Sequence, residues 1–307
     1  YLFQNNKRIA YITGISLYNR MRLTTQVPKN IKIASRDKRI TVSIGNIKGT
    51  PVKSYVDVTD KNSFDKLLKP IHPSFIINTA ALTNVDLCED EKELCDALNV
   101  RAVQWLLDFA IEKKSKLVHL STDFVFDGEK GPYKETDIPN PLSYYGESKW
   151  KSEQIIQNSD YKNWAIARTI IVFGTASKLS RSNIVLWAMD ALAEGNQMNI
   201  VDDQYRSPTF AEDLATGCLL ICTKNKTGIF HLSGEKIYSI YDFVLDIGSF
   251  LNKSTDNVRP ISSDTLNQKA HRPPRTGFDI SKAKNELGFA PRTLAQALTI
   301  LEKQLKA

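Results

Sequence analysis

The sequence predicts an α/β protein with a doubly wound parallel sheet and a smaller C-terminal lobe. Short, continuous apolar runs alternate with segments of helical periodicity up to about residue 175, a pattern typical of parallel strands covered by helices on both faces. Beyond that point the alternation loosens and amphipathic helices dominate. The 307 residues, 42% hydrophobic and 24% charged, suffice for one large α/β unit or for two lobes sharing a cleft.

The first part of the chain contains five segments that we expect to be buried parallel strands. Each is a run of apolar residues without the alternation of a half-exposed strand. Segments with apolar residues at helical spacing lie between them, and right-handed crossovers would place these helices on the sheet. The expected strands are 8–13, 31–35, 75–81, 116–122 and 164–173, and the expected helices are 63–71, 94–114 and 143–159.

The rest of the chain predicts a second, mostly helical lobe. One late apolar segment, 228–233, is expected to return to the sheet as a strand. We therefore divide the chain into a sheet domain over 1–175, which this strand rejoins, and a lobe over 176–307. Helices are expected over 182–195, 210–223, 240–252 and 294–305, with a short one inside the proline-punctuated segment 272–291.

Positive charge is concentrated at the start of the chain. Residues 1–53 contain eleven Lys or Arg and a single acid, Asp37, although the formal charge of the whole chain is only +7. This excess is compatible with attraction of phosphate groups and equally with a solvated basic surface. Because these cations are not interleaved with aromatic residues and no nucleic-acid motif is present, we predict no nucleic-acid partner.

Cysteine and histidine usage predicts neither disulfides nor a metal site. The cysteines form no C-x-x-C pair, and the four histidines are scattered without an H-E-x-x-H motif. No run of about 18 apolar residues could cross a membrane, and the first residues, YLFQNNKRIAYI, lack the features of a signal peptide. We therefore expect a cytoplasmic protein with no metal, no membrane partner and free thiols at Cys88, Cys95, Cys218 and Cys222.

The strongest chemical pattern lies in STDFVFDGEKGPYKETDIPNPLSYYGESKWKSE, residues 121–153. It contains Tyr145-x-x-x-Lys149, whose side chains share one face of a helix. A lysine cation beside a phenol lowers the tyrosine pKa, which makes Tyr145 a candidate general acid near neutral pH. Thr122 ends an expected strand, where its hydroxyl could bind the carbonyl oxygen that Tyr145 protonates. The Y-x-x-x-K motif alone is a weak signal, but Ser-Thr-Asp at a strand end one loop earlier makes it specific.

This segment resembles the extended short-chain dehydrogenase/reductases, and most closely the dTDP-4-dehydrorhamnose reductase (RmlD-like) family. The resemblance covers roughly residues 55–300. It implies a Rossmann-type doubly wound parallel sheet that binds a dinucleotide, with a smaller C-terminal substrate lobe. The further segments that carry it are FIINTAALTNVDLCEDEKELCDALNV (75–100), RTIIVFG (168–174), RSPTFAEDLA (206–215) and RPPRTGFDISKAKNELGF (272–289).

The resemblance implies a role for each matching residue. Thr122 would orient the substrate carbonyl, and Tyr145 would donate a proton as hydride arrives from the nicotinamide. Lys149 would lower the pKa of Tyr145 and hold the nicotinamide ribose, and Asn99 matches the asparagine that supports this lysine through water. Cofactor contacts are also implied for Thr13, Gly14, Ser35, Arg36, Asp57, Val58, Ala80, Ala81 and Thr83, and substrate contacts for Asp123, Phe124 and Asn183.

The implied cofactor is a nicotinamide dinucleotide, with NADPH favoured over NADH. Arg36 follows the second expected strand, where an acid would bind a ribose 2′-hydroxyl and an arginine suits a 2′-phosphate. Arg36 is also one more cation in a basic loop, so NADH stays an alternative. Simpler roles are open for other residues: Asn99 as a surface amide, Thr83 as a helix cap and Asp123 as part of an ordinary turn.

One segment departs from the family pattern T-G-x-x-G-x-x-G. Leu17 and Arg20 stand where glycines would let the pyrophosphate approach and the helix pack on its strand. Three explanations are open: the loop binds phosphate through Arg20 and Arg22, the cofactor site is lost while the fold serves an interaction, or the sequence is misread over 14–30. The complete catalytic set favours the first and the third.

The sequence therefore predicts an NADPH-dependent reductase of a 4-keto nucleotide-deoxysugar, similar to the dTDP-4-dehydrorhamnose reductases of rhamnose biosynthesis. One alternative is a non-catalytic regulatory subunit, because the regulatory β subunit of methionine adenosyltransferase resembles the same family. Another is an NAD-dependent sugar-nucleotide epimerase or dehydratase. A homodimer is compatible with the resemblance, although the sequence defines no interface.

Overall fold

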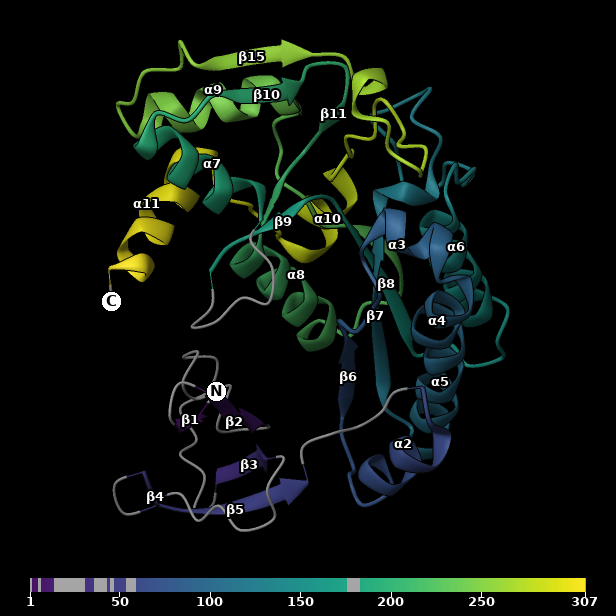
Figure 1. Cartoon of the computed structure of the whole chain (residues 1–307). Coiled ribbons are helices and arrows are strands. Elements are labelled where there is room, and N and C mark those ends of the chain that lie inside the picture. Colours follow the sequence, from purple (N-terminus) through teal and green to yellow (C-terminus); the bar gives the residue numbers. More distant parts are fainter. Residues whose placement is uncertain are drawn as a thin grey trace. The chain divides into compact units, whose positions relative to one another are not determined.

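A computed structural model of the chain describes residues 59–175 and 183–306, together with the strands within residues 2–53 (Figure 1). Of those first strands only the backbone is described. The chain divides into two compact units, Tyr1–Leu67 and Leu68–Ala307, and each unit is described by itself. The boundary near residue 175 expected from the sequence, between a sheet domain and a substrate lobe, stays a prediction.

The first unit contains a five-stranded sheet with the order β1-β2-β3-β5-β4. β3 and β5 are parallel, whereas β2 and β3 are antiparallel. We expected two parallel strands here, but a parallel pair requires a crossover and residues 14–30 lack the apolar stripe of a crossover helix. The elements are β1 (Leu2–Gln4), β2 (Lys7–Thr13), β3 (Ile31–Ser35), β4 (Ser43–Ile44), β5 (Ile47–Lys53) and α2 (Lys61–Leu68).

The second unit is organised around a parallel four-stranded sheet with the order β13-β8-β7-β6. Its strands are β6 (Phe75–Asn78), β7 (Lys116–Thr122), β8 (Trp164–Thr169) and β13 (Gly228–His231). The helices that cover it are α5 (Ala102–Lys113), α6 (Tyr144–Gln157) and α8 (Ala211–Thr223).

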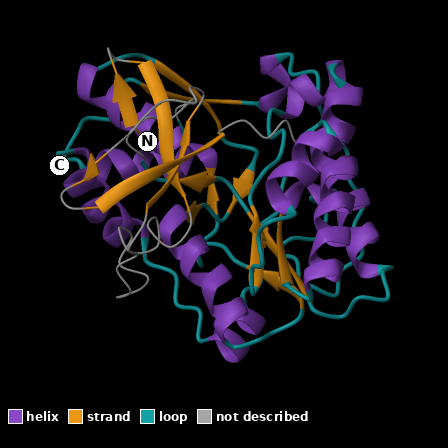
Figure 2. Cartoon of the chain, turned by 90° about the horizontal axis from the view of Figure 1, so that it is seen from below, coloured by secondary structure: helices purple, strands orange, loops and turns teal. Residues whose placement is uncertain are grey.

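Alternate residues of the central strands enter different hydrophobic cores. Leu117 and Ile166 pack with α5 and α6, whereas Val118 and Ala165 pack on the opposite face with α8. Figure 1 shows α5 and α6 on one side of the strands and α8 on the other, and Figure 2 shows helices on both sides of the central strands. Because both faces are buried, these strands are apolar throughout. The predicted doubly wound α/β fold is thereby confirmed.

A nearly continuous helical run leads from β6 to β7. It consists of α3 (Val85–Asp90), α4 (Lys92–Asp96), the π-helical turn η1 (Ala97–Arg101) and α5, which ends at Lys114 in the left-handed conformation. The helix expected over 94–114 is present but contains this π turn, which carries Asn99. Single π turns occur frequently at functional sites.

The C-terminal part forms a further core from α7, α9 and α11 packed with β10 and β15. Gly195, in the left-handed conformation, ends α7, and a capping box at Thr293 begins α11. The helices are α7 (Ile184–Glu194), α9 (Ile240–Phe250), α10 (Ser281–Leu287) and α11 (Leu294–Leu305). The short strand pairs are β9 (Val172–Phe173) with β12 (Thr209–Phe210), β11 (Tyr205–Arg206) with β14 (Tyr238–Ser239), and β10 (Met198–Val201) with β15 (Val258–Ile261).

Within the described part of the chain, no helix has the length and apolar character needed to cross a bilayer. The same residues contain no group of three or more His, Cys, Asp or Glu side chains arranged to hold a metal ion. All four cysteines are free thiols.

Candidate active site

The carboxyl end of β7 meets the start of α6. β7 ends at Thr122, and the short 3-10 turn η2 (Asp123–Val125) follows it. Tyr145 lies in the first turn of α6 and Lys149 one turn later, on the same face. Gly146 permits the close approach of the helix, because a Cβ atom there would collide with the carbonyl oxygen of Phe124. The sequence thus places three polar side chains at one buried strand end.

The structure brings Thr122 and Tyr145 together. The phenol of Tyr145 interacts with the Thr122 side chain, whose hydroxyl donates to Oδ1 of Asp123 over 3.1 Å. The backbone N–H of Phe124 donates to the same Thr122 oxygen over 3.2 Å and holds it in place. Tyr145 is 8% exposed and Thr122 is 7% exposed, so both hydroxyl groups act in a site largely removed from water.

The pKa of Tyr145 is raised, contrary to the lowering that we expected from the Y-x-x-x-K motif. Burial is the main cause, because the phenolate form loses its hydration, and the hydrogen bond with Thr122 opposes this only in part. Lys149 does not offset the effect, since its amine is directed at the Leu120 carbonyl oxygen, 2.8 Å away, and at Nε2 of His119, 3.1 Å away. Tyr145 is therefore a protonated phenol at neutral pH.

Lys149 is itself unusual for a lysine. It is 2% exposed, and burial lowers its pKa to about 8. The carboxylate of Glu153, one turn further along α6, opposes this lowering, but that carboxylate is already paired with Arg168 at 2.6 Å. Lys149 therefore exchanges its proton much closer to neutral pH than an exposed lysine does.

Asn99 is fully buried and joins two segments. Its Oδ1 accepts from the backbone N–H of Leu82 over 2.8 Å, and its Nδ2 donates to the Leu82 carbonyl over 3.1 Å and to the Ser148 hydroxyl over 2.9 Å. The alternative of a surface amide is wrong. Asn99 instead fixes the chain after β6 to α6 immediately before Lys149.

The segment after β6 contains the other described residues expected at the cofactor. Ala80 is exposed, Ala81 is half-buried and Thr83 is exposed. Thr83 does not cap a helix, because Asn84 is the N-cap of α3 and accepts from the backbone N–H of Leu87. Among the residues that the structure describes, Ala80, Ala81 and Thr83 cap no helix and belong to no buried core.

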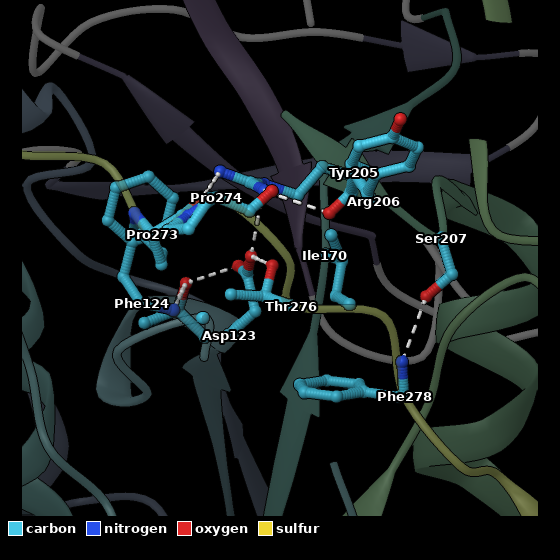
Figure 3. A network of polar contacts seen from close by, with 12 residues as sticks. Asp123, Phe124, Ile170, Tyr205, Arg206, Ser207, Pro273, Pro274, Thr276 and Phe278 are labelled. Atoms are coloured by element: carbon cyan, nitrogen blue, oxygen red, sulfur yellow. Dashed lines mark hydrogen bonds and ion pairs between the residues drawn. The ribbon is translucent and has the colours of Figure 1, made fainter. Parts of the chain in front are cut away.

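Asp123 is a buried carboxylate enclosed by donors (Figure 3). One oxygen accepts from Thr122, and the other accepts from the hydroxyl of Thr276 and lies 3.5 Å from Nε of Arg206. Burial raises the pKa of Asp123, although Arg206 and the two hydroxyl groups oppose this. The next residue, Phe124, presents its ring edge-on to Tyr145 at 5.7 Å between centroids. Asp123 is therefore more than an ordinary turn residue.

Arg206 is a residue of this network that the sequence analysis missed. Its guanidinium is 2% exposed and donates to the carbonyl oxygens of Tyr205, Pro273 and Pro274, as Figure 3 shows for the two prolines. It ties β11 and the loop around residue 274 to the carboxylate beside Thr122. The segment RSPTFAEDLA was recognised, but backbone carbonyl partners from a distant loop leave no signal in the sequence.

The remaining expected residues are not part of this cluster. Asn183 caps α7, where its Oδ1 accepts from the backbone N–H of Val185 and Leu186 and its Nδ2 donates to the Gly174 carbonyl. Thr13 and Ser35 end β2 and β3, and their side chains lie outside the described part. Gly14, Arg36, Asp57 and Val58 lie outside the described residues altogether.

A family model with the description "RmlD substrate binding domain" matches residues 30–306. The chain belongs to this family. A dTDP-4-dehydrorhamnose reductase of Aggregatibacter actinomycetemcomitans is 34% identical over 257 residues, which is 80% of this chain and 86% of that protein. A probable low-salt glycan biosynthesis reductase of Haloferax volcanii is 31% identical, covering 80% of this chain and 83% of that one. The resemblance stated from the sequence is thereby confirmed.

Solved structures of the RmlD family have the same fold. The dTDP-4-dehydrorhamnose reductase of Bacillus anthracis, in complex with NADP, has a TM-score of 0.75 and 26% identity, covering 84% of this chain and 90% of that one. A Clostridium acetobutylicum orthologue has a TM-score of 0.76 and 27% identity over 85% of this chain and 92% of its own.

The relatives of this chain also include proteins that are not named as reductases. The methionine adenosyltransferase 2 subunit beta of Xenopus laevis is 30% identical over 256 residues, which is 81% of this chain and 75% of that protein. Reductase relatives thus indicate an oxidoreductase, while these subunits keep a non-catalytic role open.

Proposed function

We propose that the protein is an NADPH-dependent reductase of a 4-keto nucleotide-deoxysugar, in which Tyr145 supplies the proton. The observation that carries this proposal is the buried arrangement of Thr122, Tyr145 and Lys149 at the carboxyl end of β7. Ligands of open α/β sheets bind at such strand ends. The dTDP-4-dehydrorhamnose reductase relatives support the substrate class.

Thr122 and Tyr145 would bind the ketone oxygen together. A carbonyl oxygen has two lone pairs, so Tyr145 would donate to one of them while Thr122 turns its hydroxyl from Asp123 to the other. Because burial raises the Tyr145 pKa, the phenol holds its proton until negative charge develops on the ketone oxygen. The O–H bond of Tyr145 then breaks, and its proton on the oxygen, together with a hydride on the carbon, completes the new alcohol and leaves a phenolate.

The residues around Lys149 fit a nicotinamide cofactor. Lys149 donates one N–H to the Leu120 carbonyl and contacts Nε2 of His119, and among the described residues nothing accepts a hydrogen bond from the buried Ser121 hydroxyl. Such groups can bind ribose hydroxyls, and the bound cofactor would supply the hydride. Asn99 would act by holding α6 in register, and Ala80, Ala81 and Thr83 would line the cofactor.

The preference for NADPH has two supports. Arg36 has the charge that a 2′-phosphate requires. The Bacillus anthracis relative was solved in complex with NADP. NADH is the alternative cofactor, and Thr13, Gly14, Ser35, Asp57 and Val58 complete the proposed dinucleotide contacts. A cytoplasmic location and a homodimer stay predictions.

The three proposed substrate-binding residues, Asp123, Phe124 and Asn183, have different surroundings in the structure. The half-buried ring of Phe124 beside Tyr145 could pack on a sugar. Asp123 uses both carboxylate oxygens internally, so its effect on a substrate would pass through Thr122. Asn183 would contact a ligand only by giving up part of its capping role at α7.

The proposal is tested by oxidation of NADPH in the presence of dTDP-4-keto-6-deoxysugars. We expect ketosugar-dependent turnover that falls by about 10²–10⁴-fold in Tyr145→Phe, as the loss of a general acid does. Tyr241→Phe, in α9 of the C-terminal lobe, is the matched control and should retain the native rate. Absence of turnover with a panel of these sugars, or equal rates for both variants, would overturn the proposal.

The second candidate function is a non-catalytic regulatory subunit. The observation that favours it is the similarity to methionine adenosyltransferase 2 subunit beta proteins, together with Leu17 and Arg20 in the glycine loop. A stable partner protein in a pull-down, retained with Tyr145→Phe, would support this candidate. The epimerase and dehydratase structures similar to this chain are at most 22% identical and show the fold alone. An epimerase or dehydratase function would be supported by NAD that stays bound to the protein through purification.

A further inference from the structure

A second buried polar cluster lies behind the catalytic residues, around His119 in the middle of β7. The imidazole is 1% exposed and contacts three side chains. Nδ1 lies 3.0 Å from Nδ2 of Asn78, while Nε2 lies 3.0 Å from the Ser152 hydroxyl and 3.1 Å from Nζ of Lys149. The proposed reaction gives His119 no role, although it contacts a catalytic residue directly.

The backbone determines which tautomer His119 adopts. The N–H of Ala80 donates to Oδ1 of Asn78 over 3.1 Å, so the amide group that faces the imidazole is the NH₂. An NH₂ group can only donate here, and Nδ1 must therefore be the nitrogen without hydrogen. Burial, aided by the charge of Lys149, holds the pKa of His119 well below its usual value, so the imidazole is neutral and carries its hydrogen on Nε2.

The Ser152 hydroxyl oxygen accepts a hydrogen bond from this N–H group. Its own hydroxyl proton is committed to the backbone carbonyl of Lys149, 2.7 Å away, which leaves an oxygen lone pair for the Nε2–H of His119. Hydrogen bonds thus run in one consistent direction from Ala80 through Asn78, His119 and Ser152 to α6. This chain connects the end of β6 across β7 to the helix that carries Lys149.

The amine of Lys149 therefore faces an N–H group of His119 rather than a lone pair. An ammonium group has only donors, so the 3.1 Å contact with Nε2 would set two N–H groups against each other. A neutral amine has a lone pair, so it can accept a hydrogen bond from Nε2–H that is shared with Ser152, and it can still donate to the Leu120 carbonyl. The charged and titratable groups facing Lys149 from other positions, Glu153 and Cys95, favour the ammonium form, but burial outweighs them.

We propose that His119 is a positioning residue whose fixed tautomer keeps Lys149 a proton-exchanging amine instead of a permanent cation. Its consequence for catalysis rests on the proposed function: after Tyr145 has given its proton to the ketone, the phenolate must be reprotonated. Because the Lys149 amine faces Leu120 and His119, a proton lost by its ammonium form would reach the phenolate through an intervening water, and the neutral amine would then take a proton from solvent. The two states of Lys149 must lie close in free energy for this exchange to turn over near neutral pH.

The tautomer is tested without any activity measurement. Nitrogen-15 spectra of histidine-labelled protein distinguish the two neutral tautomers from each other and from imidazolium, and His119→Gln assigns one of the four histidines. We expect His119 to be the Nε2–H tautomer, unprotonated from about pH 6 to about pH 9. An Nδ1–H tautomer, or protonation of His119 in this range, would overturn the proposal and leave the proposed reductase function untouched.

The effect on Lys149 is tested with Asn78→Asp. A carboxylate there can accept from both Ala80 N–H and Nδ1–H, so the imidazole hydrogen should move to Nδ1 and leave a lone pair on Nε2 for the ammonium group. We expect the pKa of Lys149 to rise by about one unit or more. The pKa is measured from the carbon-13 shifts of labelled lysine, and Lys149→Met identifies the Lys149 signal.

The double variant Asn78→Asp with His119→Phe separates the tautomer from the added charge. It keeps the carboxylate but has no imidazole, so the rise should be clearly smaller than in Asn78→Asp alone. An unchanged pKa in the single variant, or an equal rise in the double variant, would contradict the proposal. In the reductase assay the pH profile of kcat should move with the Lys149 pKa, and a protein without reductase activity would still give both NMR results.

Discussion

Replacing Arg206 by methionine should destabilise the second unit strongly, because this side chain joins three backbone carbonyls to the carboxylate beside Thr122. Methionine keeps a similar length but provides no donor. The change leaves the carbonyl oxygens of Tyr205, Pro273 and Pro274 without the guanidinium and removes the cation 3.5 Å from Asp123. Loss of one partner of a buried ion pair costs about 3–5 kcal/mol.

The magnitude for Arg206→Met follows from what stays in place. Asp123 keeps its hydrogen bonds from Thr122 and Thr276, so the carboxylate is not left wholly unpaired. We therefore expect a loss of about 4 kcal/mol in the free energy of unfolding. At about 2–4 °C per kcal/mol for a unit of this size, Tm should fall by about 8–16 °C.

The assay is thermal unfolding followed by circular dichroism, with Arg259→Met as the matched control. Arg259 lies in β15 and is exposed, so its replacement should change stability by no more than about 0.5 kcal/mol. Equal Tm values for Arg206→Met and Arg259→Met would refute the reasoning that the buried guanidinium holds β11 and the loop around residue 274 onto Asp123.

Three further substitutions test other parts of the account. Glu153→Gln should lower the free energy of unfolding by about 3–5 kcal/mol, because it leaves Arg168 buried without its carboxylate. The control Glu286→Gln removes an exposed pair with Lys226 and should cost less than about 1 kcal/mol. Similar losses in Tm for the two variants would contradict this. Gly146→Ala should reduce kcat, since its Cβ would push α6 from the Phe124 carbonyl, while the exposed Gln154→Ala on the same helix should not; a fully active Gly146→Ala would be the contrary result. Lys149→Met should raise Tm at about pH 7. The pKa of Lys149 is about 8 in the folded protein, below that of a lysine in the unfolded chain, so burying its ammonium form at pH 7 lowers the free energy of unfolding by about 3 kcal/mol. The unfolded chain binds this proton more tightly between those two values, so the gain should shrink as the pH rises from about 8 to about 10.5, and a gain independent of pH would argue against a lowered pKa.

The sequence predicted the regular elements of the second unit well, since their periodicity reflects burial directly. The strand over 116–122 and the helix over 294–305 have the expected bounds. The expected strand over 164–173 is instead divided into β8 and β9, with Ile171 at a positive φ of 35° between them. The pair of β10 and β15 was not expected, because their partners are about 60 residues apart and short strands at an edge carry little periodicity.

The catalytic residues were predictable from the sequence, whereas their environment was not. Tyr145 and Lys149 share a helix face by spacing alone, and Thr122 is placed by the strand before it. The direction of the Tyr145 pKa depends on where the Lys149 amine points, which the Leu120 carbonyl and His119 decide. The importance of Arg206 likewise depends on carbonyls of residues far along the chain.

The most direct test of the central claim is the transfer of deuterium from NADPH labelled at nicotinamide carbon 4 to a dTDP-4-keto-6-deoxysugar. The account predicts that mass spectrometry of the product finds the label on carbon 4 of the sugar. It also predicts that Tyr145→Phe slows this transfer by about 10²–10⁴-fold while the protein stays folded. A product without the label, or undiminished transfer by Tyr145→Phe, would contradict a reductase that uses Tyr145 as its proton donor.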